Sequence, residues 1–261
     1  MAPVRREIGF EPDVLAAAER LAGGDLSAFV NEAVRRVLPA AGPPSTLAAC
    51  RAAFAEALAA RDARRARSVV EEAVAGGLAI ADVYVDVLTP VLHDVGHRWA
   101  IEETTVAHEH FVTAIVQTLL PALAVHGQRK PTDGRLAVVA GTPGELHGIA
   151  LQMVTDLLER DGWEVLALGP STPAEDLTTL VRNECPDLVA LSTTTAGRLP
   201  GLADTLARLA ELDPRPLITV GGGLFTAQAS DQARALGADL VESDLRAFIA
   251  VLRARFPPAT G

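Results

Sequence analysis

From Arg135 to the end of the chain, short apolar runs alternate with helical patterns, and this alternation constrains the fold more than any other feature. The apolar runs are nearly continuous, which is typical of strands that are buried on both faces. Strands are expected at residues 136–140, 163–168, 188–192 and 217–220, with a weak fifth near Leu240, and helices at 146–160, 172–183, 199–211, 226–236 and 244–255. Such alternation predicts an α/β fold in which helices cover both faces of a parallel sheet.

Five strand–helix units fit a flavodoxin-like doubly wound domain, which we expect at residues 135–261. The residues before it predict helices of another kind. Four helices with apolar faces and short connections are expected at 46–62, 63–75, 80–99 and 104–126. Such helices pack most naturally as an antiparallel bundle. Segments of linker composition at 40–45 and 127–134 separate a predicted four-helix bundle at 46–127 from its neighbours.

Residues 1–39 predict a small β-α-α module. A short strand is expected at residues 6–10, followed by a helix from Pro12, where proline suits the opening turn, to Leu21. After a glycine turn, a second helix is expected to begin at Asp25 or Ser27, both good caps, and to end near residue 38. A module of this size cannot bury a core alone, so we expect it to dimerise.

The residues at 7–13 and 26–38 resemble the ribbon-helix-helix family of DNA-binding proteins, whose paired strands lie in the major groove. The resemblance implies that Arg5, Glu7 and Gly9 face DNA. The module carries five arginines against six acidic residues, and a helical dimerisation arm fits the same residues equally well. The sequence leaves DNA binding and simple dimerisation both open.

Net charge, the length of apolar runs and the cysteine positions limit the partners that the protein can bind and the compartment in which it can lie. A net charge of −10 argues against a general nucleic-acid coat, which needs clustered Lys and Arg, while a local DNA reader remains compatible. No apolar run has membrane length and the first ten residues lack a signal-peptide core, so we expect a cytoplasmic protein without membrane contact. Cys50 and Cys185 lie far apart in apparent helices, and no disulfide framework is implied.

Three predicted strand ends carry unusual residues: Gly144-Glu145-Leu146-His147 after the first strand, the hydroxyl run 192–195 after the third, and the glycine run 221–223 after the fourth. Parallel strands place their carboxyl ends at one edge, where open sheets bind ligands. Each feature alone also fits an ordinary turn. Together they indicate a large ligand with a long tail, for which His147 is a candidate metal ligand and Glu145 its orienting partner.

These residues resemble the CarH type of light-sensing cobalamin-binding regulators, which join a four-helix cap to a Rossmann-like domain. The family's Glu-x-His-x-x-Gly motif matches Glu145 and His147, with Ala150 in place of the last glycine. In the cap, the family's Trp is followed ten residues later by Glu-His, and Trp99, Glu109 and His110 keep that spacing. The resemblance covers about residues 46–255.

The resemblance implies adenosylcobalamin as the cofactor and His147 as the lower ligand of its cobalt. Glu145 would fix the tautomer of that histidine. Trp99 would pack on the adenosyl group, with Glu109 and His110 at its ribose and Val106 as a further contact on the upper face. The remaining cofactor-binding positions, including those that would hold the displaced nucleotide tail, are Gly148, Ser192, Thr194 (Leu in many cobalamin enzymes), Gly221 and Gly222.

Two departures from the family stand out. Ala100 follows Trp99 where the light-sensing family has a second histidine that takes the upper cobalt position after light, and neither His97 nor His93 is an obvious substitute. The family also usually carries a winged-helix DNA-binding domain of the MerR type, whereas this chain has the shorter module. The light-state ligand is therefore expected to differ.

The preferred function is a light-responsive, adenosylcobalamin-dependent transcription regulator without enzymatic activity. Loss of the adenosyl group in light would change the association of a dimer or tetramer, and with it DNA binding. A corrinoid carrier in methyl transfer is one alternative, but such carriers usually have Asp where this chain has Glu145, and Asp again where it has Gly148. A cobalamin sensor blind to light is another. An isomerase would need a substrate barrel, for which this length leaves no room.

Overall fold

The computed structural model describes residues 9–30, 44–225 and 227–257. The chain forms two units, Met1–Pro43 and Pro44–Gly261. Among the described residues, no helix is long and apolar enough to cross a membrane.

In the first unit, helix α1 (Pro12–Ala22) begins with proline in its opening turn and ends at Gly23, whose φ of 62° is left-handed. Residues 26–30 are helical, and Asp25 caps them by accepting the backbone N–H of Ala28 at 2.8 Å. Of the two predicted caps, Asp25 is thus the one that begins the second helix. No described residue of this unit is buried, in agreement with the expectation that it cannot form a core alone.

The strand expected at residues 6–10 lies largely outside the described part of the chain, as do Arg5, Glu7 and the end of the second helix. Gly9 and Phe10, the described end of that segment, adopt no strand structure. The DNA-facing role of Arg5, Glu7 and Gly9 therefore stays a prediction.

The second unit begins with the predicted helices. They are α3 (Leu47–Ala59), α4 (Ala63–Ala75), α5 (Ile80–Val83), the π-helical turn η1 (Tyr84–Leu88), α6 (Thr89–Ala100) and α7 (Val106–Ala124). Side chains of Thr46, Asp62 and Thr105 cap α3, α4 and α7. The helix expected at 80–99 corresponds to α5, η1 and α6, with η1 as an irregular turn inside it.

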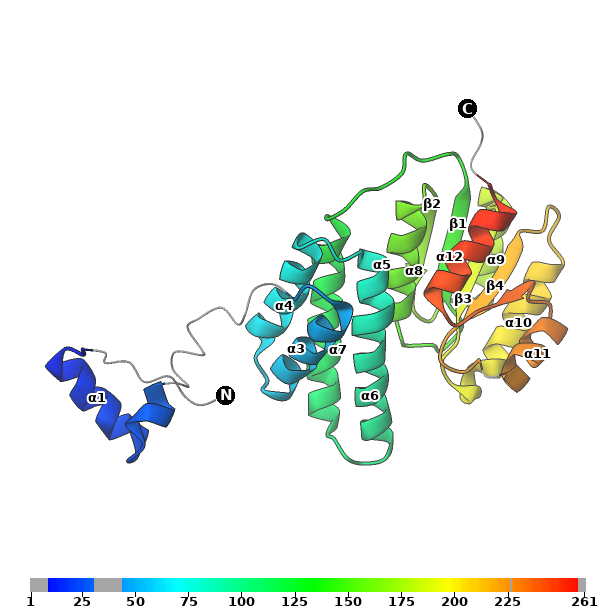
Figure 1. Ribbon diagram of the computed structural model, residues 1–261. Helices are drawn as coiled ribbons and strands as arrows, with labels where there is room; N and C mark the ends of the chain where they lie inside the picture. Colours follow the sequence, from blue (N-terminus) through cyan, green and yellow to red (C-terminus); the bar gives the residue numbers. More distant parts are fainter. Residues whose placement is uncertain (1–8, 31–43, 226, 258–261) are drawn as a thin grey trace. The chain divides into compact units, whose positions relative to one another are not determined.

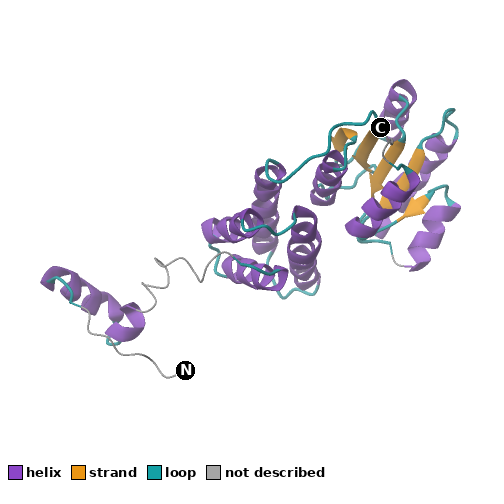
Figure 2. Cartoon of the chain, turned by 45° about the horizontal axis from the view of Figure 1, so that its top comes forward, coloured by secondary structure: helices purple, strands orange, loops and turns teal. Residues whose placement is uncertain are grey.

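Five parallel strands follow: β1 (Leu136–Gly141), β2 (Glu164–Gly169), β3 (Leu188–Ser192), β4 (Leu217–Gly221) and β5 (Leu240–Val241). Their order in the sheet is β2-β1-β3-β4-β5, which is the flavodoxin-like order. The predicted fold class, a helical bundle followed by a doubly wound parallel sheet, is confirmed. Figure 2 shows the orange strands between layers of helices.

The helices of this domain are α8 (Ile149–Arg160), α9 (Ala174–Glu184), the short 3-10 turn η2 (Ala196–Arg198), α10 (Leu199–Ala210), α11 (Ala227–Ala235) and α12 (Leu245–Arg255). Helices α8 and α12 cover the face of the sheet that is turned toward the bundle (Figure 1). Alternate strand residues point to opposite faces, so Val139 packs with the bundle core while Val138 packs with α9 and α10. One continuous core therefore joins the bundle to the sheet.

Two helices are described from later residues than the sequence predicted. The helix expected from Leu146 begins only at Ile149, because residues 142–148 form a loop in which Glu145 N–H donates to the Thr142 carbonyl and Gly144 adopts a φ of 80°. His147 therefore lies in this loop and not in a helix. The helix expected from Thr226 is described from Ala227, and Thr226 itself lies outside the described residues.

Candidate functional site

The three strand ends singled out in the sequence meet at one edge of the sheet. Ser192, the last residue of β3, pairs with Gly141 of β1 on one side and with Gly221 of β4 on the other. Beyond the strands, Thr142 N–H donates to the Ser192 carbonyl at 3.2 Å and Thr193 N–H donates to the Gly221 carbonyl at 2.9 Å. The predicted convergence of histidine loop, hydroxyl run and glycine run is therefore present.

His147 is held by Glu145 from its own loop. The ring Nδ1 lies 2.5 Å from Glu145 Oε1, and the same oxygen accepts the His147 backbone N–H at 2.9 Å. The other oxygen of Glu145 accepts the backbone N–H of Thr194 at 2.5 Å, which ties the histidine loop to the end of β3. The His147 side chain is 62% exposed while that of Glu145 is 1% exposed. In the described parts of the chain, no hydrogen bond or ion pair uses the Nε2 atom of His147.

This arrangement keeps the Glu145 carboxylate ionised and orients the His147 ring. Burial of the Glu145 carboxylate raises its pKa, but hydrogen bonds from the His147 backbone, the His147 ring and the Thr194 backbone outweigh burial and hold the pKa below its ordinary value. An ionised carboxylate at Nδ1 favours the tautomer that carries its proton there. The Nε2 lone pair is then left to face solvent as a ligand for a metal.

Sequence reasoning did not assign the residues that brace this loop. The buried hydroxyls of Thr142 and Thr193 lie 2.9 Å apart, and Gly144 N–H donates to the Ser171 hydroxyl at 3.1 Å. Thr193 belongs to the hydroxyl run that the sequence flagged, which is the signal that pointed to it. Thr142 and Ser171 follow other strands and carry no local pattern that marks them.

A cavity of about 360 Å³ opens beside this edge, within the size range of small-ligand pockets. Its walls include Ser192 and Gly221–Gly223 from the strand ends, with apolar side chains of β1, α8 and α12. The Ser192 side chain is 5% exposed, and its Oγ is one of three buried side-chain polar atoms in the described residues without a hydrogen-bond partner. A buried hydroxyl without a protein partner in a cavity wall can form a hydrogen bond with a molecule in that cavity.

The glycines at this edge are required by the close packing of the protein's own backbone. A Cβ on Gly222 would lie 2.2 Å from the Thr193 carbonyl oxygen, and Gly222 has a left-handed φ of 124°. A Cβ on Gly221 would lie 2.8 Å from the Glu242 carbonyl oxygen. An ordinary tight turn, which the sequence left open as an explanation for the glycine run, is therefore present. The same glycines also line the cavity.

The residues predicted to cover an upper ligand lie on two adjacent bundle helices. Trp99 is in the last turn of α6 and is 50% exposed, and Val106 begins α7 and is 51% exposed. Glu109 accepts the Thr113 hydroxyl at 2.7 Å, and His110 Nε2 lies 3.5 Å from its other oxygen. Within the described ranges, no hydrogen bond or ion pair joins these four residues to Glu145 or His147. Trp99 and Val106 are therefore half-exposed apolar side chains beside a Glu109 that is engaged with Thr113 and His110.

The two remaining predicted positions flank the histidine. Gly148 is the N-cap of α8, immediately after His147, and Thr194 acts through its backbone N–H to Glu145 rather than through its hydroxyl. Thr194 thus braces the loop that presents the imidazole, and Gly148 marks where that loop passes into α8.

The residues present fit a corrinoid. In the described residues, no group of three or more His, Cys, Asp or Glu side chains could hold a metal ion, so a metal at His147 must bring most of its own ligands. A corrin ring does this. The exposed Nε2 atom fits the remaining lower position, and the cavity with its unpartnered Ser192 hydroxyl fits a nucleotide tail.

Comparison with known proteins decides the family. Residues 135–248 match a family described as B12 binding domain, and residues 50–124 match a second family of the same description. These two segments of the chain are therefore B12-binding domains. The predicted cobalamin cofactor is therefore confirmed at this level, and both the sheet domain and the helical bundle are parts of the B12-binding region.

The chain is similar to two relatives from Myxococcus xanthus. The chain is 37% identical over 162 residues to the HTH-type transcriptional repressor CarH, which covers 62% of this chain and 53% of that protein. It is 32% identical over 158 residues to the HTH-type transcriptional repressor CarA, covering 60% of this chain and 52% of that protein. The predicted resemblance to the CarH type is confirmed, and the chain spans about half the length of these relatives.

A solved structure supports the fold. The Methanosarcina barkeri monomethylamine corrinoid protein superposes with a TM-score of 0.69 at 17% identity, covering 78% of this chain and 96% of that one. At this identity the likeness is one of fold alone.

Proposed function

We propose that this chain is an adenosylcobalamin-dependent, light-responsive transcription regulator and not an enzyme. The observation that carries the proposal is the pair of Glu145 and His147 at the sheet edge. A buried carboxylate holds Nδ1 of the imidazole at 2.5 Å and leaves Nε2 exposed, which is the arrangement that orients a metal-bound histidine. Bound adenosylcobalamin supplies a cobalt–carbon bond that visible light breaks.

Each predicted residue then has a definite task. His147 holds the cobalt from below, and Glu145, bound by Thr194 N–H, keeps the imidazole in place. Ser192, Gly221 and Gly222 receive the nucleotide tail in the cavity, and Gly148 shapes the loop beside it. Trp99, Val106, Glu109 and His110 cover the adenosyl group from the bundle. The half-exposed Trp99 has room to change its packing when that group leaves.

The regulatory part of the proposal rests on the two repressors that the B12-binding region resembles and on the first unit. That unit buries no described residue, so its apolar side chains favour association with a second copy of the chain. We propose that it pairs as a ribbon-helix-helix-like arm in which Arg5, Glu7 and Gly9 face DNA. A change in how the bundles associate would then change how the paired arms are presented.

The test is the visible spectrum of the purified chain with adenosylcobalamin in the dark and under green light, together with its oligomeric state. The expected result is a histidine-ligated spectrum in the dark and a change of both spectrum and assembly in light. His147→Ala should lose the histidine-ligated spectrum, while His126→Ala, whose backbone carbonyl alone serves Arg160, should retain it.

Other results would redirect the proposal. If His147→Ala leaves the spectrum unchanged, His147 is not the lower ligand. If the wild type binds adenosylcobalamin but shows no change under light, the light response is wrong. DNA affinity that depends on cobalamin concentration alone would then identify a sensor blind to light. A strong preference for methylcobalamin would instead favour a methyl carrier.

A further inference from the structure

The helical bundle supplies one wall of the cavity that we assign to the nucleotide tail. Val85, Thr89 and His93 line this cavity together with Ser192 and the glycines of the sheet edge. They are spaced four residues apart along η1 and α6, so they share one helix face. The cavity is therefore a site between the bundle and the sheet domain rather than a groove of the sheet domain alone.

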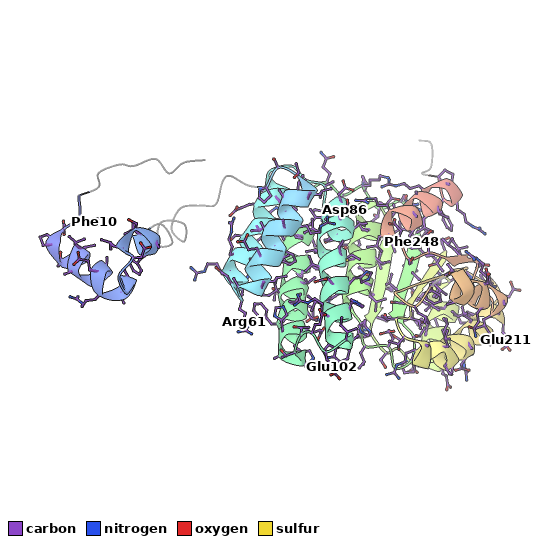
Figure 3. The ribbon with its side chains drawn as sticks, turned by 60° about the horizontal axis from the view of Figure 1, so that its bottom comes forward. Phe10, Arg61, Asp86, Glu102, Glu211 and Phe248 are labelled. Atoms are coloured by element: carbon purple, nitrogen blue, oxygen red, sulfur yellow. The ribbon has the colours of Figure 1, made fainter. Side chains whose placement is uncertain are left out.

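Two polar contacts hold this part of the bundle over the cavity. The buried Tyr84 hydroxyl donates to Asp156 of α8 at 2.9 Å. On the opposite side, Arg246 of α12 binds Asp82 at 2.9 Å and also binds Asp86. Figure 3 labels Asp86 of η1 and Phe248 of α12, and Phe248 lines this cavity.

A third contact fixes the first turn of α6. The Thr89 hydroxyl lies 4.0 Å from the sulfur of Met153, a residue of α8 that also lines the cavity. These contacts place α5, η1 and the start of α6 beside α8 and α12, and His93, one turn further along α6, lines the cavity.

His93 differs from the other polar residues of the wall. The carboxylates of Glu242 and Asp244 are engaged with backbone N–H groups, Glu242 with that of Asp244 and Asp244 with those of Arg246 and Ala247. In the described residues, the His93 side chain makes no hydrogen bond or ion pair, and Ser192 Oγ has no partner either. Of the polar side chains in the wall, His93 from the bundle, Ser192 from the sheet edge and the exposed Ser243 are therefore left to bind a polar ligand.

The remaining wall is apolar. Val139, Leu151, Val154, Val220, Leu245 and Phe248 line it. Such a surface suits a flat aromatic base, whereas the phosphate and ribose that connect a base to the corrin need hydrogen-bond partners. The apolar part of the wall thus suits the base, and the polar side chains suit the phosphate and ribose that connect the base to the corrin.

We propose that His93 donates a hydrogen bond to the phosphate–ribose segment of the nucleotide tail, opposite Ser192. Through this contact the bundle takes part in recognising the tail, and a seated tail fastens the bundle to the sheet domain. The inference rests on the proposed function, because it needs a cobalamin bound with its tail in this cavity.

The experiment compares two corrinoids, hydroxocobalamin and cobinamide, which lacks the nucleotide tail. Dissociation constants are measured by visible titration for wild type, His93→Ala, His93→Gln and His97→Ala. We expect His93→Ala to weaken hydroxocobalamin binding roughly tenfold, as for loss of one hydrogen bond to a charged group, and to change cobinamide binding less than about twofold. His93→Gln, which keeps a donor, should recover part of the loss.

His97→Ala is the matched control, since His97 is exposed one turn further along α6 and does not line the cavity. A loss for His93→Ala that matches that of His97→Ala, or one that is equal for both corrinoids, overturns the role of His93 in tail recognition. In those cases wild type still binds hydroxocobalamin and the proposed function stands. Failure of wild type to bind hydroxocobalamin at all would overturn both proposals.

Discussion

The Nδ1 atom of His147 lies 2.5 Å from Oε1 of the buried Glu145 carboxylate, whose other oxygen accepts the Thr194 backbone N–H at 2.5 Å. Glu145 therefore connects the loop after β1 to the end of β3 and sets the direction of the imidazole at the same time. Its lowered pKa keeps it ionised at neutral pH, despite the burial that opposes this charge. One carboxylate thus carries both the loop geometry and the tautomer of the proposed cobalt ligand.

Glu145→Gln should weaken hydroxocobalamin binding by roughly 10–100-fold, the usual effect of losing the partner that orients a metal-bound histidine. The amide keeps an oxygen for Thr194 N–H, but its NH₂ group opposes the proton on His147 Nδ1. Visible titration measures the affinity, and the spectrum reports whether the histidine still binds cobalt. Glu164→Gln, at an exposed position of β2, is the control and should bind as wild type does. Equal affinities for the two variants would remove Glu145 from this role.

Gly222→Ala should destabilise the fold more than Gly237→Ala. Both glycines have left-handed φ angles, 124° and 111°, so alanine meets similar backbone strain at each. Only at Gly222 would the new Cβ also lie 2.2 Å from the Thr193 carbonyl oxygen, while Gly237 has nothing within 4 Å. We expect the free energy of unfolding of Gly222→Ala to be lower by a further ~1–3 kcal/mol. Urea denaturation of the two variants measures the difference, and equal values would contradict the close approach of the two strand ends.

Local patterns predicted the sheet well because its strands are continuous apolar runs. The strand expected at 188–192 is β3 with the same bounds, and the alternation with helices predicted a parallel sheet. The hydroxyl and glycine runs marked the ligand edge for the same reason, since parallel strands end at one side of a sheet. These features depend on residues close together in the chain.

What the sequence did not reveal depends on contacts between distant residues. The helix after β1 begins at Ile149 and not at Leu146, because Glu145 is engaged with Thr194, which is 49 positions away. The position of His93 in the cavity wall was also not predicted. It depends on how the bundle packs on the sheet domain, for example through the Tyr84–Asp156 contact between residues 72 positions apart, and helical periodicity does not contain that information.

Tyr84→Phe should lower the free energy of unfolding by about 1–3 kcal/mol, because it leaves the buried Asp156 without the hydroxyl that donates to it at 2.9 Å. Burial, followed by the charge of Asp156, raises the pKa of Tyr84 far above its ordinary value, so the hydroxyl is a donor at all working pH values. Thr155→Val is the contrasting variant. Thr155 Oγ1 is buried without a partner in the described residues, so its removal should be neutral or stabilising. Denaturant unfolding of both variants tests the contrast, which a loss in Thr155→Val as large as in Tyr84→Phe would contradict.

The two cysteines should differ sharply in reactivity. Cys50 is fully buried in α3, and burial raises its pKa to about 11, while Cys185 is exposed as the C-cap of α9 rather than inside that helix. At pH 8 only about one Cys50 in a thousand is a thiolate, the reactive form. A thiol reagent should therefore label one cysteine rapidly in the native chain and two after denaturation. Cys185→Ser should abolish the rapid phase, and two rapid thiols in the native wild type would show that the bundle opens around Cys50.

Trp99→Ala should weaken the binding of adenosylcobalamin but not that of hydroxocobalamin. Because Trp99 is 50% exposed, its removal should change the free energy of unfolding by less than about 1 kcal/mol. Hydroxocobalamin has no adenosyl group for Trp99 to cover, so its binding through His147 should be unchanged, whereas adenosylcobalamin should bind several-fold more weakly. Ile101→Ala is the matched control, since Ile101 is 49% exposed two residues later. The comparison is made by visible titration in the dark with both cobalamins. If Trp99→Ala loses affinity for both cobalamins equally, or for neither, Trp99 does not cover the adenosyl group.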